Sequence, residues 1–277
     1  MDKIDFKKQF GQNFIFDTNL LKFIVESAGV TNNDDVIEIG AGAGTLTNQI
    51  ALKAKSVLSF EIDKSLMERL QKLESKHNNL KFVFEDFMQV DLNKYIIGDK
   101  RFKVVANIPY YITTPIIFKL LDFAKNIDSM MFMVQKEVAE RFCAECNKKD
   151  YGITSVILQS IADVKYVRTI KRECFTPAPN VDSALIKLDL KLDKYGIDNR
   201  EFFVDFVHNA FAMRRKTLIN NLLKKYSVSR EDLEELLKQN GLNAMIRPEN
   251  ISVIEFVNLS NQLNKMLKVK KIVNKML

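Results

Sequence analysis

The segment Asn107-Ile108-Pro109-Tyr110 places a side-chain amide, a rigid turn and an aromatic ring side by side. It follows a short β-branched run that predicts a strand. Such a turn could act on an exocyclic amine of a purine base. That amine is a poor nucleophile, because its lone pair is delocalised into the ring. Acceptors that hold the amine hydrogens aim that lone pair at an incoming group. The Asn107 side-chain oxygen and a main-chain carbonyl near Pro109 can be those acceptors. Pro109 stiffens the turn, and Tyr110 can stack on the base.

A purine can reach such a turn only as a single-stranded or flipped base, so aromatic walls are expected around it. Phe175, which opens a proline-containing loop at residues 175–179, is a candidate for the second wall. The alternative is an ordinary asparagine turn with a buried tyrosine. Taken alone, the four residues favour that alternative, so the choice depends on the neighbouring features.

A glycine-rich segment, EIGAGAGT at residues 38–45, follows a predicted strand and opens a predicted helix. Glycines there let the backbone turn sharply and approach a ligand closely. A dinucleotide site requires the spacing GxGxxG. Its third glycine would stand at position 45 or 47, and this chain has Thr45 and Thr47 there. The GxGxG spacing that begins at Gly40 and Gly42, after an acidic residue, instead fits a nucleoside ligand without a pyrophosphate.

Two acidic residues follow the next two predicted strands. Glu61, about twenty residues beyond the glycines, can accept hydrogen bonds from both ribose hydroxyls. Asp86 can accept a hydrogen bond from an exocyclic adenine amine. Open α/β sheets bind ligands at the carboxyl ends of their strands, so these carboxylates and the glycine loop should meet. Acidic residues end many strands simply because they are solvated, but three such features in this order favour S-adenosylmethionine over NAD.

Short apolar runs alternate with helical segments through the first two thirds of the chain, which is typical of βαβ units and a parallel sheet covered on both faces. A helix capped by Asp17 or Thr18 and ended by Gly29 comes first. Strands are expected at residues 36–39, 56–61, 80–84, 104–106 and 130–134. Two later strands, at 165–170 and 184–188, should add an antiparallel edge.

From residue 191 onward the signals are helical only, including capping boxes at Ser229 with Asp232 and at Ser252 with Glu255. The sequence therefore predicts an α/β domain at residues 1–190 and a small all-helical domain at residues 191–277. The second domain carries 16 Lys and Arg against 10 Asp and Glu, and the first carries 26 against 25. A basic module beside a neutral body suggests a polyanionic partner.

Composition limits where the protein works and which sites it can hold. With 277 residues, 47% hydrophobic and 28% charged, the chain is ordinary for a globular protein. No apolar run reaches the roughly 18 residues of a membrane span, and the amino terminus lacks the apolar core of a secretion signal. We expect a cytoplasmic protein without a membrane partner. Cys143 and Cys146 form a CxxC, but His77 and His208 stand alone, so no metal is expected.

These residues resemble the ribosomal RNA adenine dimethyltransferases, the family that contains KsgA and the Erm resistance methyltransferases. The resemblance extends along essentially the whole chain. It rests on residues 11–15 (GQNFI), 38–44, 107–110, 135–137 (QKE) and 175–183 (FTPAPNVDS). It implies a Rossmann-like class I methyltransferase fold, with a mostly parallel seven-stranded sheet, a late antiparallel strand and a small helical carboxyl-terminal domain.

The resemblance also implies that Asn13 and Ile15 contact the cofactor and that both N6 hydrogens of an rRNA adenine are replaced in turn. The expected cofactor-binding set is Asn13, Ile15, Gly40, Gly42, Glu61, Asp86 and Asn107. The expected catalytic set is Asn107, Pro109, Tyr110 and Phe175.

Within the family, residues 10–14 and 210–218 resemble KsgA, which dimethylates two adjacent adenosines in a hairpin near the 3′ end of small-subunit (16S) rRNA. Arg214, Arg215 and Lys216 can meet phosphates at the start of a helix, so that RNA binding should weaken with added salt. The expected partner is small-subunit rRNA or a pre-30S particle, bound by a monomer. The alternatives are an Erm-type enzyme acting on 23S rRNA, a non-catalytic assembly factor on the same fold, and a small-molecule N-methyltransferase.

Overall fold

The structure, a computed structural model, describes residues 12–276 and the side chains of residues 12–270. Phe10 and Gly11, which contribute to the family resemblance, lie outside the described residues. The chain divides into two compact units. Unit 1 comprises Met1–Ala139 and Asp163–Leu190, and unit 2 comprises Glu140–Ala162 and Lys191–Leu277. One break falls at the 190/191 boundary expected from the sequence, and a second places residues 140–162 with the helical unit.

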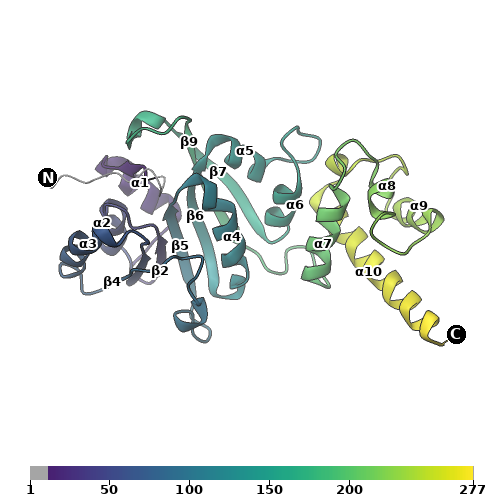
Figure 1. The fold of residues 1–277 in the computed structure, drawn as a ribbon, viewed down its shortest axis with the longest axis horizontal. Coiled ribbons are helices and arrows are strands. Elements are labelled where there is room, and N and C mark those ends of the chain that lie inside the picture. The colour runs from purple at the N-terminus through teal and green to yellow at the C-terminus, as the bar shows by residue number, and fades with distance from the viewer. Residues whose placement is uncertain (1–11, 277) are drawn as a thin grey trace. The chain divides into compact units, whose positions relative to one another are not determined.

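The elements follow one another in the order that the βαβ pattern predicts (Figure 1). Up to residue 121 they are β1 (Phe14–Ile15), α1 (Thr18–Ala28), β2 (Asp35–Ile39), α2 (Thr45–Ala51), β3 (Ser56–Phe60), η2 (Lys64–Leu66), α3 (Met67–Glu74), β4 (Leu80–Val83), η3 (Leu92–Lys94), β5 (Phe102–Asn107), η4 (Tyr110–Ile112) and α4 (Thr113–Leu121). They continue with η5 (Ala124–Asn126), β6 (Ile127–Gln135), α5 (Lys136–Cys143), α6 (Ile153–Gln159), β7 (Ala162–Ile170), η6 (Arg172–Cys174), β8 (Phe175–Thr176) and β9 (Ser183–Leu190). The last are α7 (Arg200–Ala210), α8 (Leu218–Leu222), α9 (Arg230–Gln239), η7 (Pro248–Asn250) and α10 (Val253–Met276).

The main sheet has seven strands in the order β4-β3-β2-β5-β6-β9-β7 (Figure 1). β2 pairs in parallel with β3 and with β5, and the pairs β3–β4 and β5–β6 are parallel as well. β9 runs antiparallel to β6. Every residue of β2 is buried, as in a strand whose two faces are both covered. The expected Rossmann-like fold, with a late antiparallel strand, is confirmed.

The first helix begins and ends where its capping residues predict. The Asp17 side chain accepts hydrogen bonds from the backbone N–H groups of Asn19 (2.8 Å) and Leu20 (3.3 Å). Gly29 follows the last turn in the left-handed conformation, with φ of +70°. The apolar face of α1 joins the core of unit 1 together with strand residues such as Val105 and Met131.

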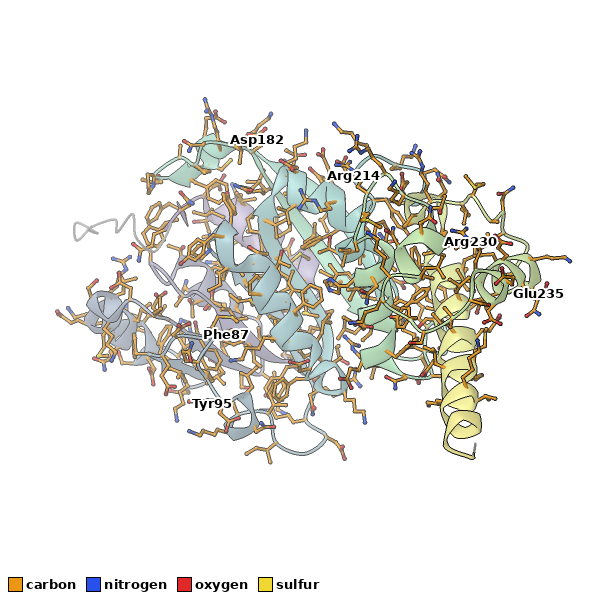
Figure 2. All side chains as sticks on the ribbon, turned by 45° about the vertical axis from the view of Figure 1, so that its right-hand side comes forward. Phe87, Tyr95, Asp182, Arg214, Arg230 and Glu235 are labelled. Atoms are coloured by element: carbon orange, nitrogen blue, oxygen red, sulfur yellow. The ribbon has the colours of Figure 1, made fainter. Side chains whose placement is uncertain are left out.

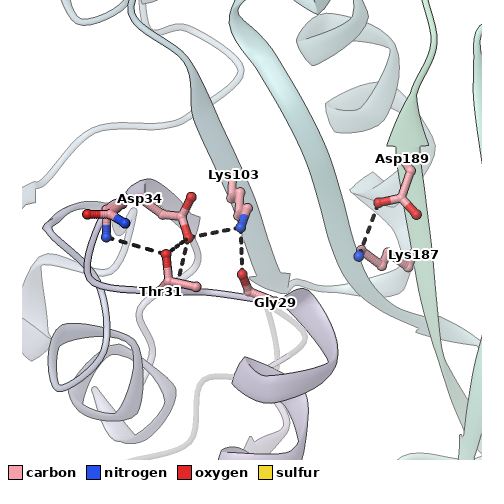
Figure 3. A network of polar contacts seen from close by, with 7 residues as sticks. Gly29, Thr31, Asp34, Lys103, Lys187 and Asp189 are labelled. Atoms are coloured by element: carbon pink, nitrogen blue, oxygen red, sulfur yellow. Dashed lines mark hydrogen bonds and ion pairs between the residues drawn. The ribbon is translucent and has the colours of Figure 1, made fainter.

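A polar network fixes the amino-terminal edge of the sheet, opposite the expected ligand edge (Figure 3). The Lys103 ammonium donates to the Gly29 carbonyl (2.5 Å) and to Asp34 (2.9 Å). Asp34 also accepts from the backbone N–H of Thr31 (2.6 Å) and from its hydroxyl (2.7 Å). The network ties the loop between α1 and β2 to β5.

A second, two-stranded sheet was not expected from the sequence. β1 pairs antiparallel with β8, placing Phe14 opposite Thr176 and Ile15 opposite Phe175. The Thr45 hydroxyl donates to the Ile15 carbonyl (2.8 Å), which ties β1 to the start of α2. These contacts hold the amino-terminal segment against the glycine loop.

The helices of unit 2 carry the caps that the sequence indicates. In α9 the Ser229 hydroxyl accepts from the Asp232 N–H (3.0 Å), and the Asp232 carboxylate accepts from the Ser229 N–H (3.1 Å). The Glu255 carboxylate likewise accepts from the Ser252 N–H (2.7 Å). Gly241 follows α9 with φ of +71°. Within residues 12–276, no helix is both long and apolar enough to cross a membrane.

Candidate active site

A pocket opens in unit 1 where β2, β3, β4 and β5 end. Backbone hydrogen bonds join the loops at this edge, from the Gly40 N–H to the Phe60 carbonyl (2.8 Å) and from the Glu61 N–H to the Val83 carbonyl (3.0 Å). The loops after all four strands and the amino-terminal segment contribute lining residues. They include Gln12, Asn13, Phe14, Ile15, Gly40, Gly42, Phe60, Glu61, Ile62, Glu85, Asp86, Phe87, Asn107, Ile108, Pro109, Tyr110 and Tyr111.

The glycine loop passes too close to its neighbours for larger residues. A Cβ at Gly42 would lie 2.6 Å from the Phe14 ring, and one at Gly40 would lie 3.3 Å from the Ile108 side chain. Both glycines have positive φ, +79° at Gly40 and +53° at Gly42, a conformation that glycine adopts without steric cost. At these two glycines the pocket wall is therefore formed by backbone atoms without side chains.

Glu61 is held in place by the backbone around it. One carboxylate oxygen accepts from the Gly42 N–H (2.7 Å), and the other accepts from the Asp63 N–H (2.7 Å). The side chain lines the pocket and is 5% exposed. Burial raises the pKa of Glu61, and the backbone donors oppose that rise. Each oxygen keeps further accepting capacity, which ribose hydroxyls can use.

Asp86 lies in the loop after β4, with one carboxylate oxygen accepting from the Met88 N–H (2.9 Å). The next residue, Phe87, also lines the pocket and packs edge-on against Phe60, with ring centroids 5.2 Å apart. Phe60 packs in the same way against Tyr95 at 5.4 Å, and Figure 2 labels both Phe87 and Tyr95. An aromatic wall therefore lies beside the expected adenine acceptor.

The charge of the pocket separates two kinds of ligand. Glu61, Glu85 and Asp86 are its acidic lining residues, and none of the described residues that line it is Lys, Arg or His. Three carboxylates repel a pyrophosphate and attract a cation. The lining therefore fits a positively charged nucleoside better than a dinucleotide.

The Asn107 turn lies at the same pocket. The Asn107 side-chain amide donates to the Asn13 carbonyl (3.2 Å), so the side-chain nitrogen is already used and the side-chain oxygen is the group left to accept. The Pro109 carbonyl accepts from the Ile112 N–H (3.2 Å) and the Thr113 hydroxyl (3.3 Å). Since the Pro109 carbonyl is engaged in this way, the neighbouring Ile108 carbonyl is the candidate for the main-chain acceptor.

Tyr110 is held by a residue of β9, the antiparallel strand that lies beyond β6 in the sheet. Its hydroxyl shares a hydrogen bond of 2.5 Å with the hydroxyl of Ser183, the first residue of β9. Ser183 is fully buried, and burial also raises the pKa of Tyr110. Ser183 lies in the segment 175–183 that carries the resemblance, and no pattern in the sequence predicts a role for it.

Asn13 and Ile15, for which the resemblance implies contact with the cofactor, both line the pocket, and Gln12 lines it too. The Gln12 amide donates to Asp63 (2.9 Å), two residues beyond Glu61. A single glutamine before a two-residue strand has no periodic pattern that could have revealed this contact.

Phe175 is displaced from its expected place. It is 3% exposed, packs in the apolar core of unit 1 and does not line the pocket. The β1–β8 pairing places it opposite Ile15, so in this structure it supports a wall residue instead of forming the wall. Tyr111, which the sequence reasoning passed over, lines the pocket and is 70% exposed.

Arg214, Arg215 and Lys216 lie in unit 2, where all three side chains are exposed, and Figure 2 shows Arg214 at the surface. They occupy the turn between α7 and α8 and not the helix start itself, because Thr217 caps α8. The Leu218 N–H donates to the Ile246 carbonyl (2.9 Å), which brings a second loop alongside. That loop exposes Arg247, a lone arginine that gave no cluster signal in the sequence.

A nucleoside pocket at the carboxyl edge of this sheet, with an amide turn beside it, is the arrangement of a Rossmann-like methyltransferase. Residues 3–265 match the family model described as ribosomal RNA adenine dimethylase. The chain therefore belongs to the ribosomal RNA adenine dimethylase family, and it is an rRNA adenine methyltransferase by that membership.

Two bacterial proteins that are 41% and 40% identical to this chain have the same name. The chain is 41% identical over 259 residues to the ribosomal RNA small subunit methyltransferase A of Clostridium acetobutylicum, covering 93% of this chain and 94% of that protein. It is 40% identical to the protein of the same name from Geobacillus thermodenitrificans, covering 95% and 93%.

Two solved structures share the fold over most of the chain. A dimethyladenosine transferase from Plasmodium falciparum has a TM-score of 0.79 at 26% identity, covering 91% of this chain and 98% of that one. The 23S rRNA methyltransferase ErmE has a TM-score of 0.71 at 27% identity, covering 91% and 100%.

Proposed function

We propose that the protein uses S-adenosylmethionine to dimethylate, at N6, two adjacent adenosines in a hairpin near the 3′ end of small-subunit rRNA. It acts as a monomer on a pre-30S particle in the cytoplasm, during assembly of the small ribosomal subunit. The observation that carries the proposal is the acidic nucleoside pocket that ends at the Asn107 turn.

The pocket residues fit S-adenosylmethionine by their chemistry. Glu61 accepts hydrogen bonds from the two ribose hydroxyls, and Asp86 accepts one from the adenine amine beside the ring of Phe87. The carboxylates complement the positive charge of the donor, and the absence of Lys, Arg and His among the described lining residues suits a ligand without phosphates. Asn13, Ile15 and the bare backbone at Gly40 and Gly42 complete this group of contacts.

The residues around Asn107 position the target amine. When bound, S-adenosylmethionine supplies a methyl group on a sulfonium centre. Transfer of that methyl group needs no strong general base, because the sulfonium is a good leaving group. In the first transfer the Asn107 side-chain oxygen and the Ile108 carbonyl would hold the two amine hydrogens and so orient the nitrogen lone pair; in the second transfer one acceptor would hold the hydrogen that remains. The amine nitrogen would gain positive charge as it takes up the methyl group, and these acceptors would stabilise that charge until a proton leaves to water. Tyr110 supports the base by stacking, and Pro109 keeps the turn rigid.

The choice of ribosomal subunit rests on the relatives and not on the fold, because ErmE shares the fold at 27% identity. Relatives of 40–41% identity, covering over 90% of the chain, are named small subunit methyltransferases. The turn with Arg214, Arg215 and Lys216, joined by Arg247 on the adjacent loop, supplies cations for RNA phosphates. A non-catalytic factor would not require the amide turn and the nucleoside pocket to coincide.

The test is to incubate the protein and radiolabelled S-adenosylmethionine with under-methylated small ribosomal subunits in one reaction and with under-methylated large subunits in another. We expect label on two adjacent adenosines of the small-subunit rRNA, found as N6,N6-dimethyladenosine after nuclease digestion. Label on 23S rRNA would support the Erm-type alternative, and no label on either subunit would support the non-catalytic one.

A further inference from the structure

Lys119 lies on α4 and makes an unusual set of contacts for a surface lysine. Its ammonium donates to three backbone carbonyls of one loop, those of Phe87 (2.7 Å), Met88 (2.9 Å) and Val90 (2.7 Å). An ammonium has three N–H donors, so this loop takes all of them. The ammonium also lies 5.4 Å from the centre of the Phe87 ring.

The loop that Lys119 binds is the loop that carries Asp86 and Phe87 into the pocket. It follows β4, which ends at Val83, and precedes η3, which begins at Leu92, so no strand pairing holds it. Asp86 organises the N–H groups of the turn, since its side chain accepts from Met88 (2.9 Å) and its carbonyl accepts from Gln89 (2.8 Å). Lys119 binds the carbonyl groups of the same turn by donating hydrogen bonds to them.

The chemistry around Lys119 argues for an orienting role. Burial lowers the pKa of Lys119, and the negative charges of Asp86 and Asp91 oppose that lowering. The side chain does not line the pocket, so it does not touch a ligand directly. Its helix begins at Thr113, six residues after Asn107, so one helix supports both the adenine loop and the methyl-transfer turn.

We propose that Lys119 is a positioning residue that sets the loop at residues 85–90, so that Asp86 can recognise the exocyclic amine of the adenine in the cofactor. This proposal rests on the proposed function, because Asp86 is assigned to the adenine there. A purely structural lysine would stabilise the fold without affecting which base is preferred. A positioning lysine makes the preference for adenine depend on its three donors.

The experiment compares two ligands by titration calorimetry: S-adenosylhomocysteine and S-inosylhomocysteine, which carries a carbonyl oxygen on C6 of the base where the first has the amine. We expect the unaltered protein to bind the adenine compound at least about tenfold more tightly, the effect of about one hydrogen bond. In Lys119→Met, which keeps the chain length and loses the donors, this ratio should fall to about threefold or less. Lys119→Gln keeps a shorter side chain with two donors and should give an intermediate ratio, and it serves if the Met variant does not fold.

Lys125→Met, an exposed lysine of the segment that follows α4, is the matched control and should leave the ratio unchanged. If the unaltered protein discriminates and the Lys119 variants discriminate equally well, Lys119 has no positioning role and the proposed function stands. If the unaltered protein does not discriminate, the assignment of Asp86 fails and the Lys119 proposal fails with it. A weaker affinity for both ligands at a constant ratio would likewise overturn the positioning role.

Discussion

Asn107 and Glu61 both face the pocket with part of their hydrogen-bonding capacity already taken by the backbone. Asn107 donates to the Asn13 carbonyl, and Glu61 accepts from the N–H groups of Gly42 and Asp63. These contacts fix each side chain before a ligand arrives, so little reorganisation is needed during the reaction. For Asn107, the amide orientation that satisfies Asn13 is also the one that leaves an acceptor for the target amine.

Asn107→Ala tests that acceptor. We expect the rate of methyl transfer to small subunits to fall by about 10²-fold or more, the effect of removing one preorganised hydrogen-bonding group from a transition state. Affinity for S-adenosylmethionine should fall much less, because Glu61 and Asp86 remain. Single-turnover transfer rates and calorimetric binding constants check the two parts separately. Asn93→Ala, an exposed asparagine, is the control, and turnover retained in Asn107→Ala would remove the acceptor role.

At the scale of elements, the glycine loop and β1 depend on each other. The Phe14 ring lies 2.6 Å from the place of a Cβ at position 42, so the two-residue strand keeps its position against the loop because this residue is glycine. β8 holds β1 from the other side through the pairing of Ile15 with Phe175. The amino-terminal wall of the pocket is therefore formed by β1 and the glycine loop and supported by β8, three segments that are distant in sequence.

Gly42→Ala should disturb that wall. The added methyl group would meet the Phe14 ring at 2.6 Å and would strain a backbone with φ of +53°. We expect affinity for S-adenosylhomocysteine to fall by about tenfold or more, a loss of about 1.4 kcal/mol. Gly29→Ala is the matched control, because its φ is +70° but no described residue lies within 4 Å of the new Cβ. It should cost about 1 kcal/mol of stability and leave the affinity unchanged; equal effects on affinity would exclude the clash.

Much of this arrangement follows from local sequence signals. The caps of α1 at Asp17 and Gly29 are short-range features, and the parallel pairing of β2 with β3 and β5 agrees with the alternating βαβ segments. Glu61 and Asp86 could be placed together, because parallel strands end at one edge of a sheet. These parts of the fold and of the pocket were therefore predictable.

The remaining parts depend on contacts between distant segments. The strands β1 and β8 have two residues each, too few for a periodic pattern, and they pair across most of unit 1. The burial of Phe175 follows from that pairing, so its sequence neighbours could not reveal it. From the sequence, Lys119 is expected on a solvated face of its helix. Its contacts become visible only in the structure, where the loop after β4 places three carbonyls beside it.

At the scale of the whole molecule, positive charge is concentrated in the helical unit. Residues 191–277 carry a net charge of +6, and residues 1–190 carry +1. Arg214 and Arg215 stand exposed in the turn between α7 and α8. If this turn meets RNA phosphates, its contribution to binding depends on counterion release and hence on salt.

Reversing both charges, Arg214→Glu with Arg215→Glu, should weaken binding to small-subunit rRNA. It should also reduce the slope of log affinity against log salt by about 1.4–1.8, because each lost phosphate contact removes about 0.7–0.9. Filter binding across a salt series measures both effects. Lys53→Glu with Lys76→Glu changes the net charge equally in unit 1, where both lysines are exposed. If that control gives the same change of slope, net charge is responsible and the turn is not the contact.

The stability of unit 1 should depend on pH through a group that the reaction does not use. Glu38, in the middle of β2, is fully buried, and one of its oxygens accepts from the Ser59 hydroxyl (2.6 Å). Among the described residues, its other oxygen makes no hydrogen bond of ordinary geometry, and the Thr47 hydroxyl lies close enough to favour the ionised carboxylate. Burial raises the pKa of Glu38 to about 7, the Ser59 and Thr47 hydroxyls oppose the rise, and the charge of Glu61 adds to it.

Because the pKa of Glu38 is higher in the folded state than its ordinary value of 4.5, the folded state binds the proton more tightly. The resulting stability is complete below about pH 4.5 and is lost as the pH rises through about 7. Glu38→Gln does not titrate, so between pH 5 and 8 the free energy of unfolding of the variant should improve relative to the unaltered protein by about 1–3 kcal/mol. Urea unfolding at both pH values measures this difference. Asp34→Asn is the control: its network holds the pKa of Asp34 below 3.8 although burial opposes this, so its effect on stability should not change over the same range. A difference for Glu38→Gln that is also constant would show that Glu38 keeps an ordinary pKa in the folded protein.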